Sequence, residues 1–163
     1  MNKKPKTKDL TVAIFCAASY AALVFFLAPI SFLQIQLRVA NALIGLVPIM
    51  GMPAVYGLTI GIFIGNIFSP LGPIDLLSPF PSFIGLLILH RLRKRGVLLG
   101  LVLYSLIVSA WVAFMLATVF GLPYVITFVY VFVGVATATA GLGFLLYKAV
   151  SSTGFRKLLE GER

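Results

Sequence analysis

Two isolated charges, Arg38 and Asp75, are the side chains of this sequence whose setting points most directly to chemistry. Residues 10–90 carry no other formal charge. A lone charge in hydrocarbon costs several kcal/mol, so such a residue usually faces a partner, water or a solute rather than lipid. The polar segments that hold the two charges, residues 34–38 and 66–75, are therefore the first candidates for a functional site.

Enzymatic chemistry has few residues to work with in this chain. Its only acidic residues are Asp9, Asp75, Glu160 and Glu162, so no pair of carboxylates for general acid-base catalysis can form in the apolar region. The sequence has no cluster of metal ligands, no phosphate-binding glycine loop and no serine nucleophile motif. We therefore predict no enzyme, no metal and no cofactor. Any ATP-driven step would come from another subunit.

The elements that must position the two charges are membrane helices. Of the 163 residues, 61% are hydrophobic and 10% are charged, which is far too apolar for a soluble domain of this length. The net charge of +9 comes from short clusters that flank apolar runs, without the pattern of a nucleic-acid-binding groove. We predict an integral protein of the cell membrane that crosses the bilayer several times and binds no nucleic acid.

Three apolar runs are long enough to cross a bilayer, and one region is ambiguous. Residues 11–28, 97–120 and 124–147 each cover about 30 Å as a helix. Residues 42–90 are interrupted at Gly51-Met52-Pro53 and again by prolines further on. The apolar runs alone do not fix how often this region crosses.

Basic clusters limit the number of crossings. The N-terminal lysines, the cluster at residues 91–95 and the basic residues after 147 should all be cytoplasmic by the positive-inside rule. An even number of crossings then separates each pair of clusters, so residues 42–90 cross once or three times. Three crossings give an all-α bundle of six transmembrane helices with both termini in the cytoplasm. In the competing model residues 42–68 form a re-entrant hairpin, and the chain crosses four times.

The six-span model divides the chain into three parts. These are a basic cytoplasmic tail (1–10), a single transmembrane helical domain (11–150) and a cytoplasmic C-terminal tail (151–163). The polar interruptions at 29–41 and 69–81 both fall on the outer face, where the two isolated charges converge. Prolines and glycines in the second interruption forbid a continuous helix there.

Two stripes of small residues repeat every four positions and offer flat surfaces for helix packing. They are Gly57, Gly61 and Gly65 in one apolar run, and Ala13, Ala17 and Ala21 in the first. Either stripe can pack inside the bundle. The alanine stripe is the better candidate for an external partner, because a first helix can lie at the edge of the bundle.

Residues 38–43 and 65–75, followed by the basic cluster after the next helix, resemble the QueT family of queuosine-precursor transporters. Members are substrate-binding (S) components of energy-coupling factor (ECF) transporters. The resemblance implies a six-helix S component with an outward-facing pocket, a membrane T subunit and two cytoplasmic ATPases. The small-residue motif that docks the family's first helix on the T subunit corresponds to Ala13 and Ala17.

The resemblance also implies a 7-deazaguanine solute, in its cyano or aminomethyl form. Asn41 stands where members commonly have glutamate, which makes the neutral cyano form at least as plausible as the cationic aminomethyl form. We expect the Asp75 carboxylate to accept two hydrogen bonds from the amino and ring N–H groups of such a base. In the competing interpretation Arg38 and Asp75 pair with each other and hold two loops together.

Further solute contacts are expected from polar and aromatic neighbours of the two charges. Asn41, Asn66 and Gln36 would read the other polar edges, with Arg38 orienting Asp75, and Phe32, Phe68 or Phe80 would stack on the ring.

Other classes of function stay open at this point. The chain could be an S component for another vitamin-like solute or a stand-alone small-solute carrier. A carrier normally shows a coupling carboxylate in a helix or an inverted repeat, and neither is evident here. A membrane scaffold would explain the small-residue stripes but not the two charged segments.

Overall fold

The computed structural model describes residues 7–27, 38–67 and 69–152, and these residues are mostly helical and contain no strand. The elements in order are α1 (Thr7–Phe26), η1 (Val39–Leu46), α3 (Val47–Met50), α4 (Met52–Asn66), η2 (Gly72–Leu77), α5 (Pro79–Leu92), α6 (Val97–Phe120), α7 (Tyr124–Ala136), η3 (Thr137–Gly143) and α8 (Phe144–Ser152). Elements η1 and η2 are 3₁₀ helices, whereas η3 is a π-helix. The predicted all-α class is confirmed for the described residues.

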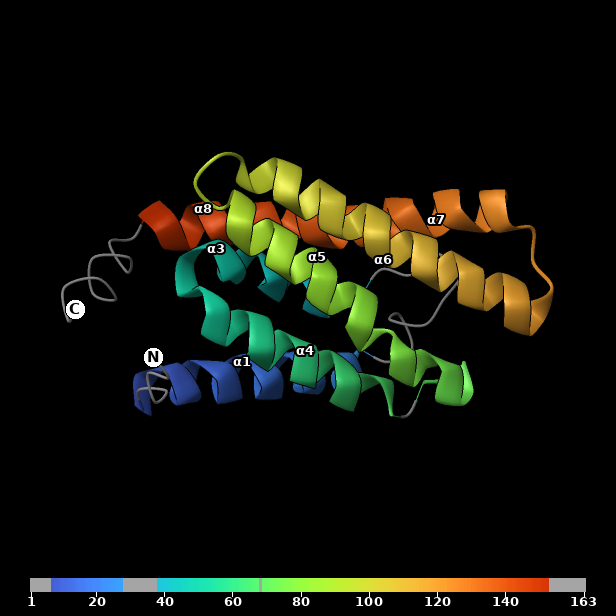
Figure 1. Cartoon of the computed structure of the whole chain (residues 1–163), viewed down its shortest axis with the longest axis horizontal. Helices are drawn as coiled ribbons and strands as arrows, with labels where there is room; N and C mark the ends of the chain where they lie inside the picture. The colour runs from blue at the N-terminus through green and yellow to red at the C-terminus, as the bar shows by residue number, and fades with distance from the viewer. Residues whose placement is uncertain (1–6, 28–37, 68, 153–163) are drawn as a thin grey trace.

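The helices lie roughly along one long axis and run alternately in opposite directions (Figure 1). Four helical runs are long and apolar enough to cross a membrane: Thr7–Phe26, Gly72–Leu92, Val97–Phe120 and Tyr124–Ser152. Two further apolar runs, Val39–Met50 and Met52–Asn66, are shorter. The ambiguous region of the sequence therefore forms three helical runs.

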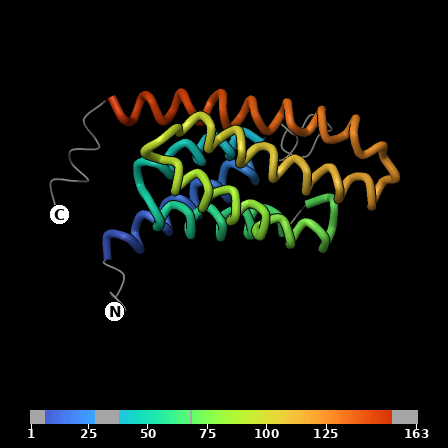
Figure 2. The backbone as a smooth tube through the Cα atoms, turned by 45° about the horizontal axis from the view of Figure 1, so that its top comes forward, coloured from blue at the N-terminus to red at the C-terminus, as the bar shows by residue number. Residues whose placement is uncertain are grey.

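The start of α1, the end of α8 and the connection between α5 and α6 all lie at the same end of the bundle (Figures 1 and 2). That connection contains most of the basic cluster at residues 91–95. Those three places, which the distribution of basic residues assigns to one side of a membrane, therefore share one end of the molecule.

Glycine and proline set the ends of several helices. Gly51 has a φ of 77° and separates α3 from α4, whose first turn contains Pro53. Gly121 is in the left-handed conformation and ends α6 just before Pro123. The expected breaks at these two places are observed. Helix α5 begins at Pro79, inside the polar interruption expected at 69–81, because prolines fit the first helical turn, where the missing N–H would have no partner.

The two stripes of small residues pack against each other, joining α1 to α4. A Cβ on Gly57 would overlap the carbonyl group of Ala13, and one on Gly61 would lie 2.9 Å from the carbonyl oxygen of Ala17. Both stripes thus serve close packing inside the bundle, one of the two roles expected for them. Docking of a partner on the alanine stripe stays a prediction. Because Ala21 is buried and the other two alanines are half-buried, a partner could reach only their edge.

A second close crossing joins η1 to η3. A Cβ on Gly45 would overlap the backbone of Gly143, so the 3₁₀ and π segments touch through bare backbone. This crossing holds the start of η1, with Arg38 and Asn41, close to the last helical run. It therefore helps to form one wall of the site described next.

Candidate solute-binding site

Asp75 lies in η2 and is almost fully buried, with 1% of its surface exposed. Its Oδ1 accepts a hydrogen bond from the Ser78 hydroxyl and another, at 3.1 Å, from Nδ2 of Asn66. The same Nδ2 also donates to the backbone carbonyl of Asp75 at 3.1 Å. One oxygen of the carboxylate is thus held by two donors from neighbouring elements.

Asn66, at the end of α4, connects the two isolated charges. Its Oδ1 accepts a hydrogen bond of 2.9 Å from Nη1 of Arg38, while its Nδ2 donates to Asp75. Both Arg38 and Asn66 are buried. The structure therefore brings Arg38 and Asp75 to one site, with an amide side chain between them whose orientation both neighbours determine.

Ser78 extends this network to α6. Trp111 donates its indole N–H to the Ser78 hydroxyl oxygen at 3.0 Å, and Ser78 donates its own proton to Asp75 Oδ1. The other carboxylate oxygen, Asp75 Oδ2, is buried with no hydrogen-bond partner among the described residues. A buried acceptor without a hydrogen bond costs free energy, and a donor from a bound molecule would remove this cost.

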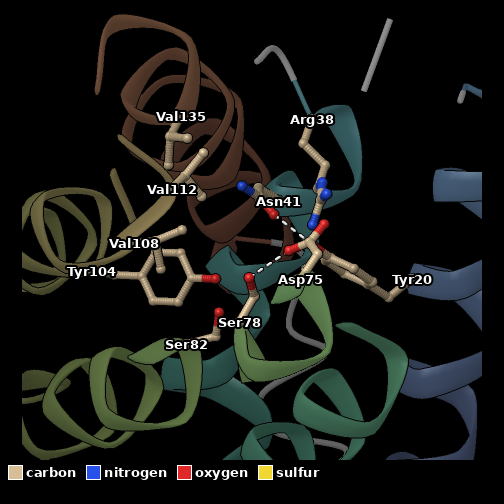
Figure 3. A pocket seen from close by; sticks show the side chains of 10 residues that line it. All are labelled: Tyr20, Arg38, Asn41, Asp75, Ser78, Ser82, Tyr104, Val108, Val112 and Val135. Atoms are coloured by element: carbon tan, nitrogen blue, oxygen red, sulfur yellow. Dashed lines mark hydrogen bonds between the residues drawn. The ribbon is translucent and has the colours of Figure 1, made fainter. Parts of the chain in front are cut away.

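A second fixed amide lies on the same side of the site. Tyr20, from α1, donates its hydroxyl to Oδ1 of Asn41 at 2.7 Å. Because the amide oxygen is committed to Tyr20, the amide nitrogen of Asn41 is turned the other way, toward Val112 and Val135 (Figure 3). Asn41 therefore offers a hydrogen-bond donor where Asp75 offers an acceptor.

These side chains surround a small cavity between the helices (Figure 3). Its lining residues are Tyr20, Arg38, Asn41, Asp75, Ser78, Ser82, Tyr104, Val108, Val112 and Val135. One wall is polar and comes from α1, the start of η1 and the run Gly72–Leu92, and the other is mainly apolar and comes from α6 and α7. The volume is about 20 Å³, which is room for about one water molecule. A nucleobase would need the two walls to move apart.

Several residues selected from the sequence are brought together here. Arg38, Asn41 and Asp75 line the cavity, and Asn66 joins two of them. Phe80 does not line it and is 69% exposed, because residues two apart on a helix face different ways and Ser78 and Ser82 take the cavity side. Three other candidates, Phe32, Gln36 and Phe68, lie outside the described residues.

The sequence reasoning missed most of the residues that complete the site. Ser78 follows Asp75 by three positions and Ser82 follows Ser78 by four, a polar stripe that could have been recognised on a helical run covering residues 72–92. Tyr104, Val108 and Val112 repeat every four residues along α6, but this pattern is the same as that of any buried helix face. Tyr20 gave no signal, because a tyrosine in an apolar helix is usual.

The long helices of this chain are apolar enough to cross a membrane, which makes it a helical membrane protein. It encloses two buried opposite charges beside a cavity, and this is a candidate site for a polar solute. A family model described as QueT transporter matches residues 10–152. The chain therefore belongs to the QueT transporter family, and the resemblance found in the sequence is confirmed. This family assigns the chain a part in transport rather than catalysis. Comparisons with curated proteins and with solved structures gave no match.

Proposed function

We propose that this protein is the substrate-binding S component of an ECF-type importer and that its solute is a 7-deazaguanine precursor of queuosine, in the cyano or aminomethyl form. The observation that carries this proposal is the Asp75 carboxylate. One of its oxygens is held by Ser78 and Asn66, while the other is buried beside the cavity with no donor among the described residues.

The geometry makes the expected contact with the base more specific. Asp75 Oδ1 already accepts two hydrogen bonds, so the amino and ring N–H groups of the base would converge on Oδ2. A carboxylate oxygen in a dry site discriminates strongly, because a solute without donors leaves it buried and unsatisfied. The valine wall from α6 and α7 would cover one face of the ring, in place of the stacking expected from Phe80.

The proposal includes six crossings of the cell membrane with both termini in the cytoplasm. A Cβ on Gly51, between the two short runs, would lie 3.5 Å from Nη1 of Arg93 and 3.7 Å from Cε1 of His90. The turn at Gly51 therefore reaches the basic end of the bundle. A re-entrant hairpin would leave this turn inside the bilayer, so its position supports two separate crossings by residues 39–66.

The partners follow from the same proposal. A membrane T subunit would bind the S component, with Ala13, Ala17 and Ala21 as the docking stripe, and two cytoplasmic ATPases would drive release of the solute. Purification from the native membrane should recover these three subunits with the chain. Uptake of solute into vesicles that contain the chain alone would favour the stand-alone carrier instead.

The decisive experiment is titration of the purified protein with the cyano and aminomethyl deazaguanines and with guanine. We expect at least one deazaguanine to bind, and Asp75→Ala to weaken that binding about 100-fold, since a charge-assisted bond is lost. Phe80→Ala is the matched control, because Phe80 is exposed and does not line the cavity. Failure of both deazaguanines to bind would overturn the assignment, whether or not guanine binds. Unchanged affinity in a folded Asp75→Ala variant would remove Asp75 from the site.

A further inference from the structure

We infer that the site selects a neutral solute over a cationic solute of the same shape. This inference rests on the proposed function, because it concerns which member of the solute class binds. Its basis is the balance of charge around the cavity. Among the lining residues there is one anion, Asp75, and one cation, Arg38, so the formal charges of the described lining cancel before any solute enters.

Hydrogen bonds through Asn66 hold the Arg38 and Asp75 charges close to each other. Arg38 is bound to Asn66, and Asn66 is bound to Asp75, so the guanidinium and the carboxylate share one hydrogen-bonded unit. Arg38 is 6% exposed and Asp75 is 1% exposed. At such burial water screens the charges poorly, and each acts strongly on any further charge placed beside it.

Among the described residues, Asp75 is the only carboxylate that lines the cavity. Asp9 lies in the first turn of α1, and α1 starts at the basic end of the bundle. Glu160 and Glu162 follow the last described helix by several residues in the sequence, and residues 28–37 contain no acidic residue. An ammonium group in the cavity would therefore have to share Asp75 with Arg38, leaving a buried excess of positive charge.

Asn41 strengthens this selection. Because Tyr20 holds its amide oxygen, Asn41 turns its amide nitrogen away from Tyr20 (Figure 3). An amide N–H is a good partner for a neutral acceptor such as a nitrile or carbonyl group, and a poor one for an ammonium group, which has only donors. Donors on one edge of the solute would meet Asp75, and an acceptor on another edge would meet Asn41.

The test compares the two deazaguanines, which share a ring system and differ in a neutral cyano or a cationic aminomethyl substituent at pH 7. We expect the unmodified protein to bind the cyano form more tightly by at least about tenfold, because an uncompensated buried charge is strongly unfavourable. Equal or tighter binding of the aminomethyl form would overturn the inference while leaving the proposed function in place. Binding of neither compound would overturn both.

A variant separates charge from contact. Asn41→Asp keeps the shape of the side chain and an oxygen for the Tyr20 hydroxyl, but adds a carboxylate to the cavity wall. It should shift the ratio of the two affinities toward the aminomethyl form by at least about tenfold. Asn41→Ala is the control, since it removes the amide without adding charge and should produce no such gain. If Asn41→Asp folds and leaves the ratio unchanged, charge balance is not what selects the solute.

Discussion

At the scale of single residues, the two oxygens of Asp75 have different surroundings, and this difference gives the neighbouring side chains distinct tasks. Ser78 and Asn66 hold Oδ1, and Trp111 in turn holds Ser78. These residues do not have to touch the solute to matter. They fix the direction in which Oδ2 points, and a hydrogen bond to a misdirected carboxylate is weak.

We predict that Trp111→Phe lowers solute affinity by about 2- to 10-fold, the range expected for one lost hydrogen bond. Ser78→Ala should cost more, because it removes a donor to the carboxylate itself. The double variant should cost less than the product of the two effects, since Trp111 acts through Ser78. Isothermal titration calorimetry of the four proteins measures this coupling. Independent effects would show that Trp111 only packs.

Tyr20→Phe tests the orientation of Asn41. Loss of the hydroxyl releases the Asn41 amide, which can then turn its oxygen into the cavity. We expect affinity for the cyano deazaguanine to fall by about 2- to 10-fold. Tyr56→Phe, at a half-exposed tyrosine that does not line the cavity, should have no effect. Binding can be followed by the fluorescence of Trp111, the only tryptophan of the chain, which is bonded to the site. An unchanged affinity in Tyr20→Phe would mean that the fold alone orients Asn41.

The residues that the sequence reveals are those whose type is rare in their setting. Arg38 and Asp75 stand out because apolar runs surround them, and Asn41 and Asn66 because they flank these charges. Tyr20, Ser82 and Tyr104 are ordinary residues of apolar helices, and only the packing of α1, α5 and α6 makes them neighbours. A residue of this kind cannot be assigned to a site from one sequence, because its partners are set by tertiary structure.

At the scale of elements, the contact between α1 and α4 depends on the absence of side chains at the glycine stripe. We predict that Gly57→Ala destabilises the protein by about 1–3 kcal/mol, because the new methyl group meets the backbone of Ala13, which cannot move aside easily. The measurement is thermal unfolding in detergent. Gly141→Ala is the control, since a Cβ there meets nothing within 4 Å, and its stability should be equal or slightly higher. Equal stability of both variants would contradict the close contact.

The spacing of small residues predicts a packing face but not its partner. Both stripes were visible in the sequence, and each could have faced another helix or another protein. Only the structure shows that the two stripes face one another. The 3₁₀ segment η1 and the π segment η3 gave no signal in the sequence either. Their hydrogen-bond patterns depart locally from the α-helix, and these departures occur where Gly45 and Gly143 cross closely.

At the scale of the whole molecule, the open question of the sequence was whether residues 42–68 cross the membrane twice. The structure resolves the region into two short helices whose connection lies beside Arg93. A bilayer can thin around short hydrophobic helices at modest cost, so their length does not forbid crossing. The position of the connection is the stronger argument, because the positive-inside rule places the basic cluster in the cytoplasm.

The labelling of single introduced cysteines in intact cells measures on which side of the membrane each connection lies. The native Cys16 is buried and is first replaced by alanine. We predict that a cysteine at Met52 reacts with a membrane-impermeant thiol reagent only after the cytoplasmic side is opened, as should one at Lys94 in the basic cluster. A cysteine at Leu122, between α6 and α7 at the opposite end, should react from outside. If Met52→Cys is protected from both sides while the two controls react as expected, its turn lies within the bilayer. The re-entrant hairpin with four crossings would then replace the six-helix topology.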